Sequence, residues 1–261
     1  MNKPLSLLPL SLCVLLLLGS VHEARSQVWQ PLPGTTWQIQ FSKLPVDTGV
    51  EAEVFDVDGF DNDAEVVADL HTRGRRVIGY VSAGTYEEWR DDAAQYPAAV
   101  LGKPLDEWPG ERWLDVRRLD VLAPLVNARL DVLKSKGFDA VDFDNVDAYA
   151  NDSGFPLTAA DQLAFNRFLA DAAHARGMAV GLKNDLEQVP DLVGVFDFAI
   201  NEQCFFYKES KRLKPFVAAN KAVFVIEYDL PLNQFADQAR KLRYSAIKKH
   251  LSLDRWRKAR P

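Results

Sequence analysis

The sequence predicts an α/β fold, a (β/α)8 TIM barrel in a single domain, from two observations. Short segments rich in β-formers recur eight times along the chain, and amphipathic stretches with a period of 3.6 residues lie between most of them. Strands that alternate with helices pair in parallel through right-handed crossovers, and eight such units in this length are typical of a barrel. The expected strands lie in residues 37–41, 52–58, 75–82, 112–116, 139–145, 178–184, 196–202 and 222–228.

Residues 1–26 are expected to be a signal peptide. Lys3 gives the segment a positive start, residues 5–18 are almost entirely apolar, and residues 24–26 read ARS, a cleavage pattern. The apolar run is short for the ~20 residues that a membrane-spanning helix needs. We therefore expect residues 27–261 to form the barrel domain of a secreted or periplasmic protein, with no membrane segment after processing.

The expected helices have recognisable patterns. Residues 62–74 and 122–137 repeat apolar side chains at helical spacing. The pattern of residues 158–177 is the clearest, because Thr158 stands at the N-cap, Asp161 at the capping-box position, and Gly177 at the stop.

Some regions depart from simple alternation. The link between the first two strands is too short for a helix, and residues 85–112 are long, aromatic and Pro-containing, so we expect an elaborated loop at the mouth of the barrel. The basic residues 235–261 have a helical pattern that most simply caps the barrel with a solvated face, and binding to an acidic surface is the alternative. A doubly wound open sheet is the alternative fold, but no G-x-G-x-x-G turn follows the first strand.

Composition excludes several classes of function. The net charge of −6 argues against a general binder of nucleic acid or of anionic membranes. Cys204 is the only cysteine after removal of the signal peptide, so a packed core rather than an internal disulfide must stabilise the domain. The histidines form no ligand spacing, and we expect neither a metal site nor another cofactor.

Polar residues gather at the ends of the expected strands. In a barrel of this kind the carboxyl ends of the strands form the active-site face, so these side chains converge on one mouth. Any one of them is more often a cap or a loop anchor than a catalyst, and the prediction depends on their convergence. They are Asp56, Asp58, Ser82, Asp115, Asp142, Asp144, Asn145, Lys183, Asn184, Glu202 and Glu227.

A mouth that is rich in carboxylates and poor in histidine suits glycoside hydrolysis. One carboxyl group attacks the anomeric carbon or activates water, and the other protonates the leaving oxygen. Aromatic residues near the strand ends and in the long loop, among them Trp89 and Trp108, suit the faces of sugars, although ordinary packing explains most of them equally well.

Several segments at these strand ends resemble the signature blocks of glycoside hydrolase family 114, the endo-α-1,4-polygalactosaminidases. The blocks occur in order and cover roughly residues 37–228. They read VFDVDGFD, VIGYVSAGTYEEWRDD, GERWLDVR, KGFDAVDFDNVDAY, VGLKND, FAINEQC and FVIEY.

The resemblance implies a barrel enzyme that hydrolyses α-1,4-linked, partially deacetylated galactosamine-containing polysaccharide with retention. It assigns Asp144 as the nucleophile and Glu202 as the general acid/base, with the exchanged assignment left open. A retaining pair implies carboxyl groups about 5–5.5 Å apart. The expected substrate contacts are Asp56, Asp58, Tyr80, Lys183, Asn184 and Glu227. The free amines of such a polymer are cationic, so further carboxylates would attract it to the mouth.

Two departures from the family pattern affect how far the resemblance extends. Asp142-Phe143 replaces a Glu-Pro that often precedes the catalytic Asp, and Cys204 lacks the second cysteine with which many members pair it. The substrate preference is therefore open. Hydrolysis of another α-linked polysaccharide and a catalytically silent sugar-binding barrel are the alternatives, whereas the acidic charge and the export signal oppose a tRNA-related role. We expect a monomer without a nucleic-acid partner.

Overall fold

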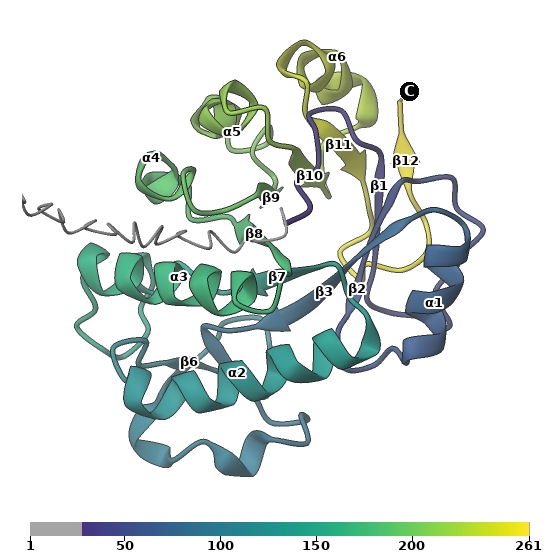
Figure 1. Ribbon diagram of the computed structural model, residues 1–261. Helices are drawn as coiled ribbons and strands as arrows, with labels where there is room; N and C mark the ends of the chain where they lie inside the picture. The colour runs from purple at the N-terminus through teal and green to yellow at the C-terminus, as the bar shows by residue number, and fades with distance from the viewer. Residues whose placement is uncertain (1–27, 261) are drawn as a thin grey trace, which may run out of the picture.

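A curled nine-stranded sheet forms the centre of the computed structural model, which describes residues 28–260 (Figure 1). The expected signal peptide lies outside the described residues. Eight strands pair in parallel in chain order, and the ninth, β12, pairs antiparallel with β11. The strands are β1 (Trp37–Gln40), β2 (Val54–Asp58), β3 (Arg76–Ser82), β7 (Ala140–Asp144), β8 (Ala179–Lys183), β9 (Phe198–Glu202), β10 (Val223–Glu227), β11 (Ser245–Lys248) and β12 (Lys258–Ala259).

Helices cover the outside of the sheet and connect its parallel strands (Figure 1). They are α1 (Ala64–Thr72), α2 (Leu119–Lys136), α3 (Ala159–His174), α4 (Val189–Leu192), α5 (Lys214–Ala218) and α6 (Leu232–Leu242). The three helices predicted from amphipathic patterns all form. Thr158 and Asp161 make the predicted capping box of α3. As expected, β1 and β2 are joined without a helix.

Alternation along each strand separates two hydrophobic layers. In β7, Ala140 belongs to the cluster inside the barrel, whereas Val141 and Phe143 belong to the cluster between the sheet and the helices. This period of two sends Asp142 and Asp144 to the same interior side, as the sequence predicts. The interior is therefore apolar near the start of the strands and acidic toward their ends.

The backbone ladder is open between β1 and β11. Other contacts bridge this seam: the Trp37 indole donates to the Ser245 carbonyl at 2.7 Å, and the Phe41 amide donates to the Leu253 carbonyl at 2.9 Å. The predicted α/β barrel class is confirmed, with a seam in place of a continuous ladder.

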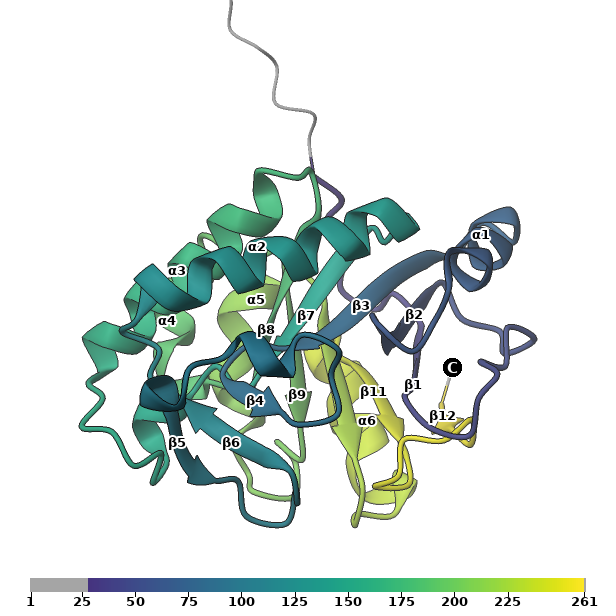
Figure 2. The same cartoon turned by 90° about the horizontal axis from the view of Figure 1, so that it is seen from below.

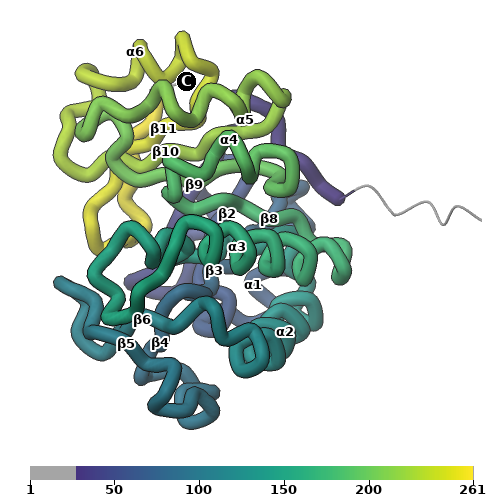
Figure 3. Tube along the Cα trace, turned by 90° about the vertical axis from the view of Figure 1, so that its left-hand side faces the viewer, coloured from purple at the N-terminus to yellow at the C-terminus, as the bar shows by residue number. Residues whose placement is uncertain are grey.

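The segment predicted as the fourth barrel strand belongs to another sheet. Residues 112–116 overlap β6 (Glu111–Leu114), which lies antiparallel between β4 (Thr85–Glu87) and β5 (Leu101–Pro104). Figures 2 and 3 show these three strands beside the barrel, and in Figure 3 they lie at the opposite end of the view from α6. No crossover helix lies between β3 and this segment, so it folds back on itself rather than joining the parallel sheet. The elaborated loop predicted for residues 85–112 is this small sheet.

The true eighth strand lies in the segment that was expected to be a helical cap. The amphipathic pattern ends where Arg243 adopts a left-handed conformation (φ +60°) after α6, and β11 follows at once. Helical periodicity in the first half of the segment concealed the short strand in the second half. Among residues 28–260, no helix combines the length and apolarity that crossing a bilayer requires.

Candidate active site

Three neighbouring strands end with side chains that meet at the mouth of the barrel: Asp144 on β7, Lys183 on β8 and Glu202 on β9. In each case the next residue adopts a left-handed conformation, and at β7 and β8 it is an asparagine, which tolerates this region. The turn takes the chain out of the strand directly after the functional residue. Gly84, which follows β3, packs so closely on the backbone carbonyl of Asn145 after β7 that a Cβ atom on Gly84 would clash with it.

Lys183 contacts both predicted catalytic acids. Its Nζ atom lies 3.1 Å from Oδ1 of Asp144 and 3.4 Å from Oε2 of Glu202. Since both distances start from one nitrogen, the two carboxylate oxygens lie no more than 6.5 Å apart, the two legs placed end to end. Acids that are 58 positions apart in the sequence therefore face one sugar-sized space.

The buried ammonium group is held charged by its neighbours. Only 3% of the Lys183 side chain is exposed. Burial lowers the pKa of Lys183, but the carboxylates of Asp144 and Glu202 raise it more, so that it lies well above the usual lysine value. The mouth thus contains a fixed positive charge between two acids.

Asp144 accepts from further donors. The Tyr80 hydroxyl donates to its Oδ2 at 3.1 Å, and the backbone N–H of Asn145 donates to its Oδ1 at 2.8 Å. Together with Lys183, these donors fix the orientation of the carboxylate. Burial and the charge of Asp144 raise the pKa of the Tyr80 hydroxyl, so it remains a donor.

Glu202 has its own set of partners. The Tyr228 hydroxyl donates to Oε1, and the Asn184 amide donates to Oε2 at 3.4 Å. The side-chain Oδ1 of Asn184 also accepts from the backbone N–H of Glu202 at 3.0 Å, which ties the end of β8 to that of β9. Tyr228 was not singled out from the sequence. The signal was present, because Phe224, Ile226 and Tyr228 alternate toward the interior while Glu227 points the other way.

Two predicted substrate contacts lie away from the mouth. Glu227 is buried behind the sheet, where its Oε1 accepts from the Phe205 amide at 2.8 Å and anchors the loop after β9. Burial raises the pKa of Glu227 to about 7. Asp56 lies inside the barrel, fully buried, one layer below Asp58. The sequence marked both as strand-end acids, but the side on which each residue points and its depth in the barrel separate them from the cleft.

Asp56 and Asp142 form a buried acid pair beneath Lys183. Apart from each other, the two carboxyl groups have no hydrogen-bond partner among the described residues. Burial raises the pKa of Asp142 to about 7, although Lys183 opposes this effect, and burial together with the charge of Asp142 raises that of Asp56 well above its usual value. Two adjacent buried anions are unfavourable, so the pair retains at least one proton near neutral pH.

Asp58 does reach the cleft but is engaged by Arg90. The guanidinium group donates to both carboxylate oxygens, at 3.1 and 2.7 Å, and also contacts Glu87. This buried cluster attaches the small antiparallel sheet to the rim of the barrel. Asp58 therefore lines the wall as part of an ion pair.

Two clefts meet at Asp144 and Lys183. One, of about 360 Å³, extends from Asp144 and Glu202 toward Trp89 and Glu111; the other, of about 230 Å³, extends toward Asp147. Burial raises the pKa of Glu111 to about 7, and burial with the charge of Asp144 raises that of Asp147 to about 6. The residues common to both clefts are Leu105, Trp108, Asp144, Asn145, Lys183 and Asn184.

The small sheet supplies much of the cleft wall. Trp89 and Trp108, which are 52% and 50% exposed, lie in the segment that connects and flanks its strands. Large apolar side chains that remain half exposed in an acidic cleft are suited to contact with the faces of sugars.

Comparisons with known proteins agree with this geometry. A model of the glycoside-hydrolase family GH114 matches residues 20–260. The crystal structure of Aspergillus fumigatus Ega3 in complex with galactosamine is 41% identical, with a TM-score of 0.85, over 89% of this chain and 97% of that chain.

Two further relatives are more distant. The glycoside hydrolase domain of PelA from Pseudomonas aeruginosa is 15% identical, with a TM-score of 0.67 over 86% of this chain and 98% of that domain, and this likeness concerns the fold alone. An uncharacterized protein of Deinococcus radiodurans is 31% identical over 206 residues, which cover 67% of this chain. The chain spans 65% of the length of that relative.

Proposed function

The chain belongs to glycoside-hydrolase family GH114, and from this premise we propose that it is a secreted hydrolase of α-1,4-linked galactosamine-containing polysaccharide that works by a two-carboxylate retaining mechanism. One observation carries the proposal: Lys183 contacts both Asp144 and Glu202 at the meeting point of two acidic clefts.

In the first step, Asp144 attacks the anomeric carbon while Glu202 gives a proton to the glycosidic oxygen. In the second step, Glu202 takes a proton from a water molecule as its oxygen attacks the anomeric carbon, and the bond between the sugar and Asp144 breaks. The three donors on Asp144 suit a nucleophile, because they hold its carboxylate in one orientation. Glu202 suits proton exchange with solvent, because 28% of its side chain is exposed. The carboxylate oxygens of Asp144 and Glu202 lie no more than 6.5 Å apart, a limit that is compatible with the spacing of about 5–5.5 Å in retaining enzymes.

Charge supports an amino-sugar substrate. Ammonium groups on a partially deacetylated polymer are attracted to carboxylates such as Asp61, whose side chain is 57% exposed, and Asp147. The Ega3 complex contains galactosamine, the monosaccharide unit that we propose for the substrate of this chain. Two clefts that meet at Asp144 accommodate sugar on both sides of the scissile bond, which supports endo action.

The decisive experiment measures release of reducing ends from partially deacetylated galactosaminogalactan by the wild type, Asp144→Asn and Glu202→Gln. We expect each variant to lose at least about 10³-fold in kcat, because a nucleophile or a proton donor is removed. Asp120→Asn, which changes an exposed acid on α2, is the matched control and should retain full activity. Wild-type activity in Asp144→Asn would remove this residue from the mechanism.

The anomeric form of the first product distinguishes the two stereochemical courses. Proton NMR during the first turnovers should show the α-anomer before mutarotation, and an initial β-anomer would contradict retention. A panel of neutral α-linked polysaccharides tests the substrate class. Binding without cleavage of every polymer would indicate the sugar-binding barrel instead.

We further propose that the chain is exported, processed before Gln27 and active as a monomer. Mass spectrometry of the protein recovered outside the cytoplasm should give an N-terminus at residue 27. Light scattering should give the mass of one chain.

A further inference from the structure

The larger cleft at the mouth is lined by an acid that has no cation of its own. Glu111 is the first residue of β6 in the small antiparallel sheet, and only 6% of it is exposed. Its Oε2 atom accepts from the Thr85 hydroxyl at 2.7 Å. Its Oε1 atom has no hydrogen-bond partner among residues 28–260 and is not sealed from solvent, so it is open to the cleft.

Strand register places Glu111 opposite another acid. Glu87 on β4 and Glu111 on β6 are direct partners across the ladder, and both side chains lie on the buried face of the small sheet. Like charges directly opposite each other destabilise a sheet. Arg90 neutralises Glu87 at 2.9 Å, whereas no cation of the described residues pairs with Glu111. The arrangement therefore leaves a place for a cation that comes from outside.

The surroundings of Glu111 oppose its negative charge until such a cation arrives. Burial raises the pKa of Glu111 to about 7. The charges of Glu87 and Asp144 add to this effect, whereas its hydrogen bond and the charge of Arg90 oppose it. The Tyr80 hydroxyl lies within range of the same carboxyl group and stays protonated. A cation close to Oε1 favours the ionised form, so cation binding and loss of the proton are linked.

Hydrogen bonds also connect Glu111 to the proposed nucleophile. The side-chain amide of Asn145 donates to the Thr85 hydroxyl at 3.0 Å, and Thr85 donates to Glu111. The backbone N–H of the same asparagine donates to Asp144. Glu111 is therefore anchored to the turn that positions the nucleophile, and its place relative to the scissile bond is fixed.

Aromatic surface lies in the same cleft. Trp89 and Trp108 are half-exposed and line it together with Glu111. The face of a tryptophan attracts both the apolar face of a sugar ring and an ammonium group close to it. A carboxyl group without a cation and an aromatic wall together suit a sugar that carries a primary amine.

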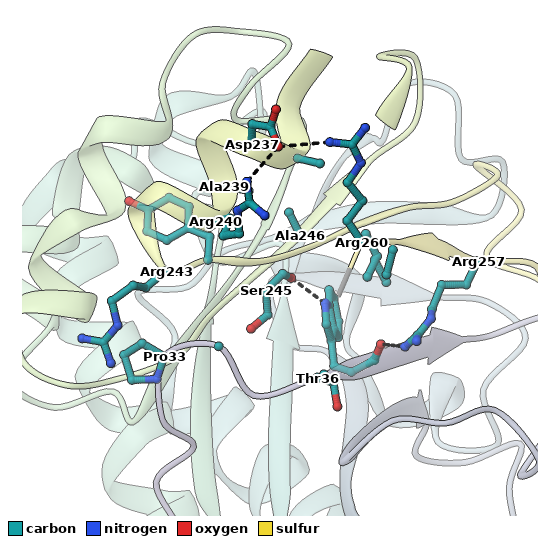
Figure 4. Close-up of a pocket in the computed structure, with 16 residues that line it drawn as sticks. Pro33, Thr36, Asp237, Ala239, Arg240, Arg243, Ser245, Ala246, Arg257 and Arg260 are labelled. Carbon is teal, nitrogen blue, oxygen red and sulfur yellow. Dashed lines mark hydrogen bonds and ion pairs between the residues drawn. The ribbon is translucent and has the colours of Figure 1, made fainter. Parts of the chain in front are cut away.

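A cavity at the seam has the opposite character. It has a volume of about 280 Å³, and its walls include Trp37, the first residue of β1, so it lies at the other end of the barrel from the mouth (Figure 4). Asp237, the one carboxylate among its lining residues, is shared by Arg240 and Arg260 at 3.3 and 3.0 Å (Figure 4). This cavity leaves no carboxylate for an amine.

We propose that Glu111 recognises the free amine of one galactosamine unit and thereby determines which units of the polymer the enzyme accepts beside the scissile bond. This inference rests on the proposed amino-sugar substrate and names the residue that selects it. The ammonium group pairs with Oε1 of Glu111, and a tryptophan of the same cleft contacts the ring. An N-acetylated unit brings a neutral and bulkier amide to the same place and binds more weakly.

Calorimetric titration of the whole protein at pH 7 tests the proposal, with D-galactosamine, N-acetyl-D-galactosamine and D-galactose as probes. We expect the wild type to bind galactosamine at least about tenfold more tightly than the two neutral sugars. Glu111→Gln should bind galactosamine about tenfold more weakly than the wild type and the neutral sugars equally well, because one charged contact is lost. Wild-type affinity for galactosamine in Glu111→Gln would overturn the proposal.

The pH dependence of binding separates a charge contact from a structural role. Because Glu111 must lose its proton, the affinity of the wild type for galactosamine should rise between about pH 5.5 and 7. Titration in two buffers of different ionisation enthalpy should show release of protons on binding. Glu111→Gln should show a smaller rise and release fewer protons, and an identical pH dependence in the two proteins would contradict a contact between Glu111 and the amine.

A matched control and a kinetic readout complete the test. Glu88→Gln changes an exposed acid next to β4 that lines neither cleft, and it should behave as the wild type does. Glu111→Gln keeps the shape of the side chain and removes the repulsion by Glu87, so its thermal stability should be unchanged or higher. Its KM for partially deacetylated galactosaminogalactan should rise about tenfold, more than its kcat falls.

The same kinetic measurement on a fully acetylated polymer reports selectivity. The preference of the wild type for the deacetylated polymer should fall about tenfold in Glu111→Gln, and an unchanged preference would overturn the role of Glu111 while leaving the hydrolase activity in place. Absence of any cleavage by the wild type would instead contradict the proposed function, and the calorimetric comparison would still decide whether Glu111 binds the amine.

Discussion

The two ends of the barrel combine cationic side chains and carboxylates in opposite ratios. At the mouth, one cation, Lys183, lies between two carboxylates, Asp144 and Glu202. At the seam, one carboxylate, Asp237, lies between two guanidinium groups. Lys183 is 3% exposed, whereas the side chains around Asp237 are 51–71% exposed. Burial therefore makes the first cluster a tightly coupled unit and leaves the second open to solvent and ligands.

The first test of this contrast removes the buried cation. Lys183→Met leaves two carboxylates facing each other above the Asp56–Asp142 pair. We expect a loss of about 3 kcal/mol in the free energy of unfolding at pH 7, measured by urea denaturation, and a loss of at least about 10²-fold in kcat. Lys183→Arg keeps the charge and should recover most of the stability. An equally stable Lys183→Met protein would show that the mouth is no more coupled than the seam.

The second test uses pH. The pKa of Asp142 is raised by burial to about 7 in the folded protein and is about 4 when unfolded. The unfolded chain therefore loses this proton at a lower pH than the folded protein does. The contribution of protonated Asp142 to the free energy of unfolding is fully present below about pH 4 and is lost as pH rises toward 7. Asp142→Asn lacks this titration. We expect the free energy of unfolding of this variant to fall less steeply than that of the wild type between pH 4 and 7. The two slopes should differ by up to about 1.4 kcal/mol per pH unit.

Denaturation curves at several pH values measure this slope. Asp139→Asn changes the acid directly before β7, which pairs with Arg76 and His71 and is not part of the buried pair, and serves as the comparison. Identical pH slopes for the wild type and Asp142→Asn would contradict a protonated pair beneath the mouth.

The third test removes the carboxylate at the seam. Because Asp237 is 58% exposed, Asp237→Asn should change the unfolding free energy by less than about 1 kcal/mol, and added salt should reduce the difference further. A destabilisation as large as that of Lys183→Met would contradict the distinction between the two clusters.

Strand and helix patterns in the sequence predict the barrel class and seven of its eight parallel strands. The eighth strand was missed because four residues of β11 follow directly on an amphipathic helix, and so short a strand has little periodicity of its own. Residues 112–116 have the composition of a strand, but composition does not specify a partner. Pairing with β4 and β5 determines that this segment lies outside the barrel.

The same division applies to the site. Position at a strand end identified Asp144, Lys183 and Glu202, because every parallel strand of a barrel finishes at one face. Glu227 shares that position but points behind the sheet, and Asp56 shares the acidic composition but lies one layer too deep. The side on which Glu227 points follows from alternation along the strand, because its neighbour Tyr228 points into the barrel. The depth of Asp56 depends instead on how the strands are staggered.

By itself, the sequence determined the fold class, the family resemblance and the group of acids that converge on the mouth, because these depend on patterns that are local along the chain. Only the tertiary structure decided that Lys183 bridges Asp144 and Glu202, that Asp56 and Asp142 are buried together, and that arginines from α6 and the C-terminal segment surround one cavity. These features join residues that are distant in sequence, and their distances arise only when the strands close around a shared interior.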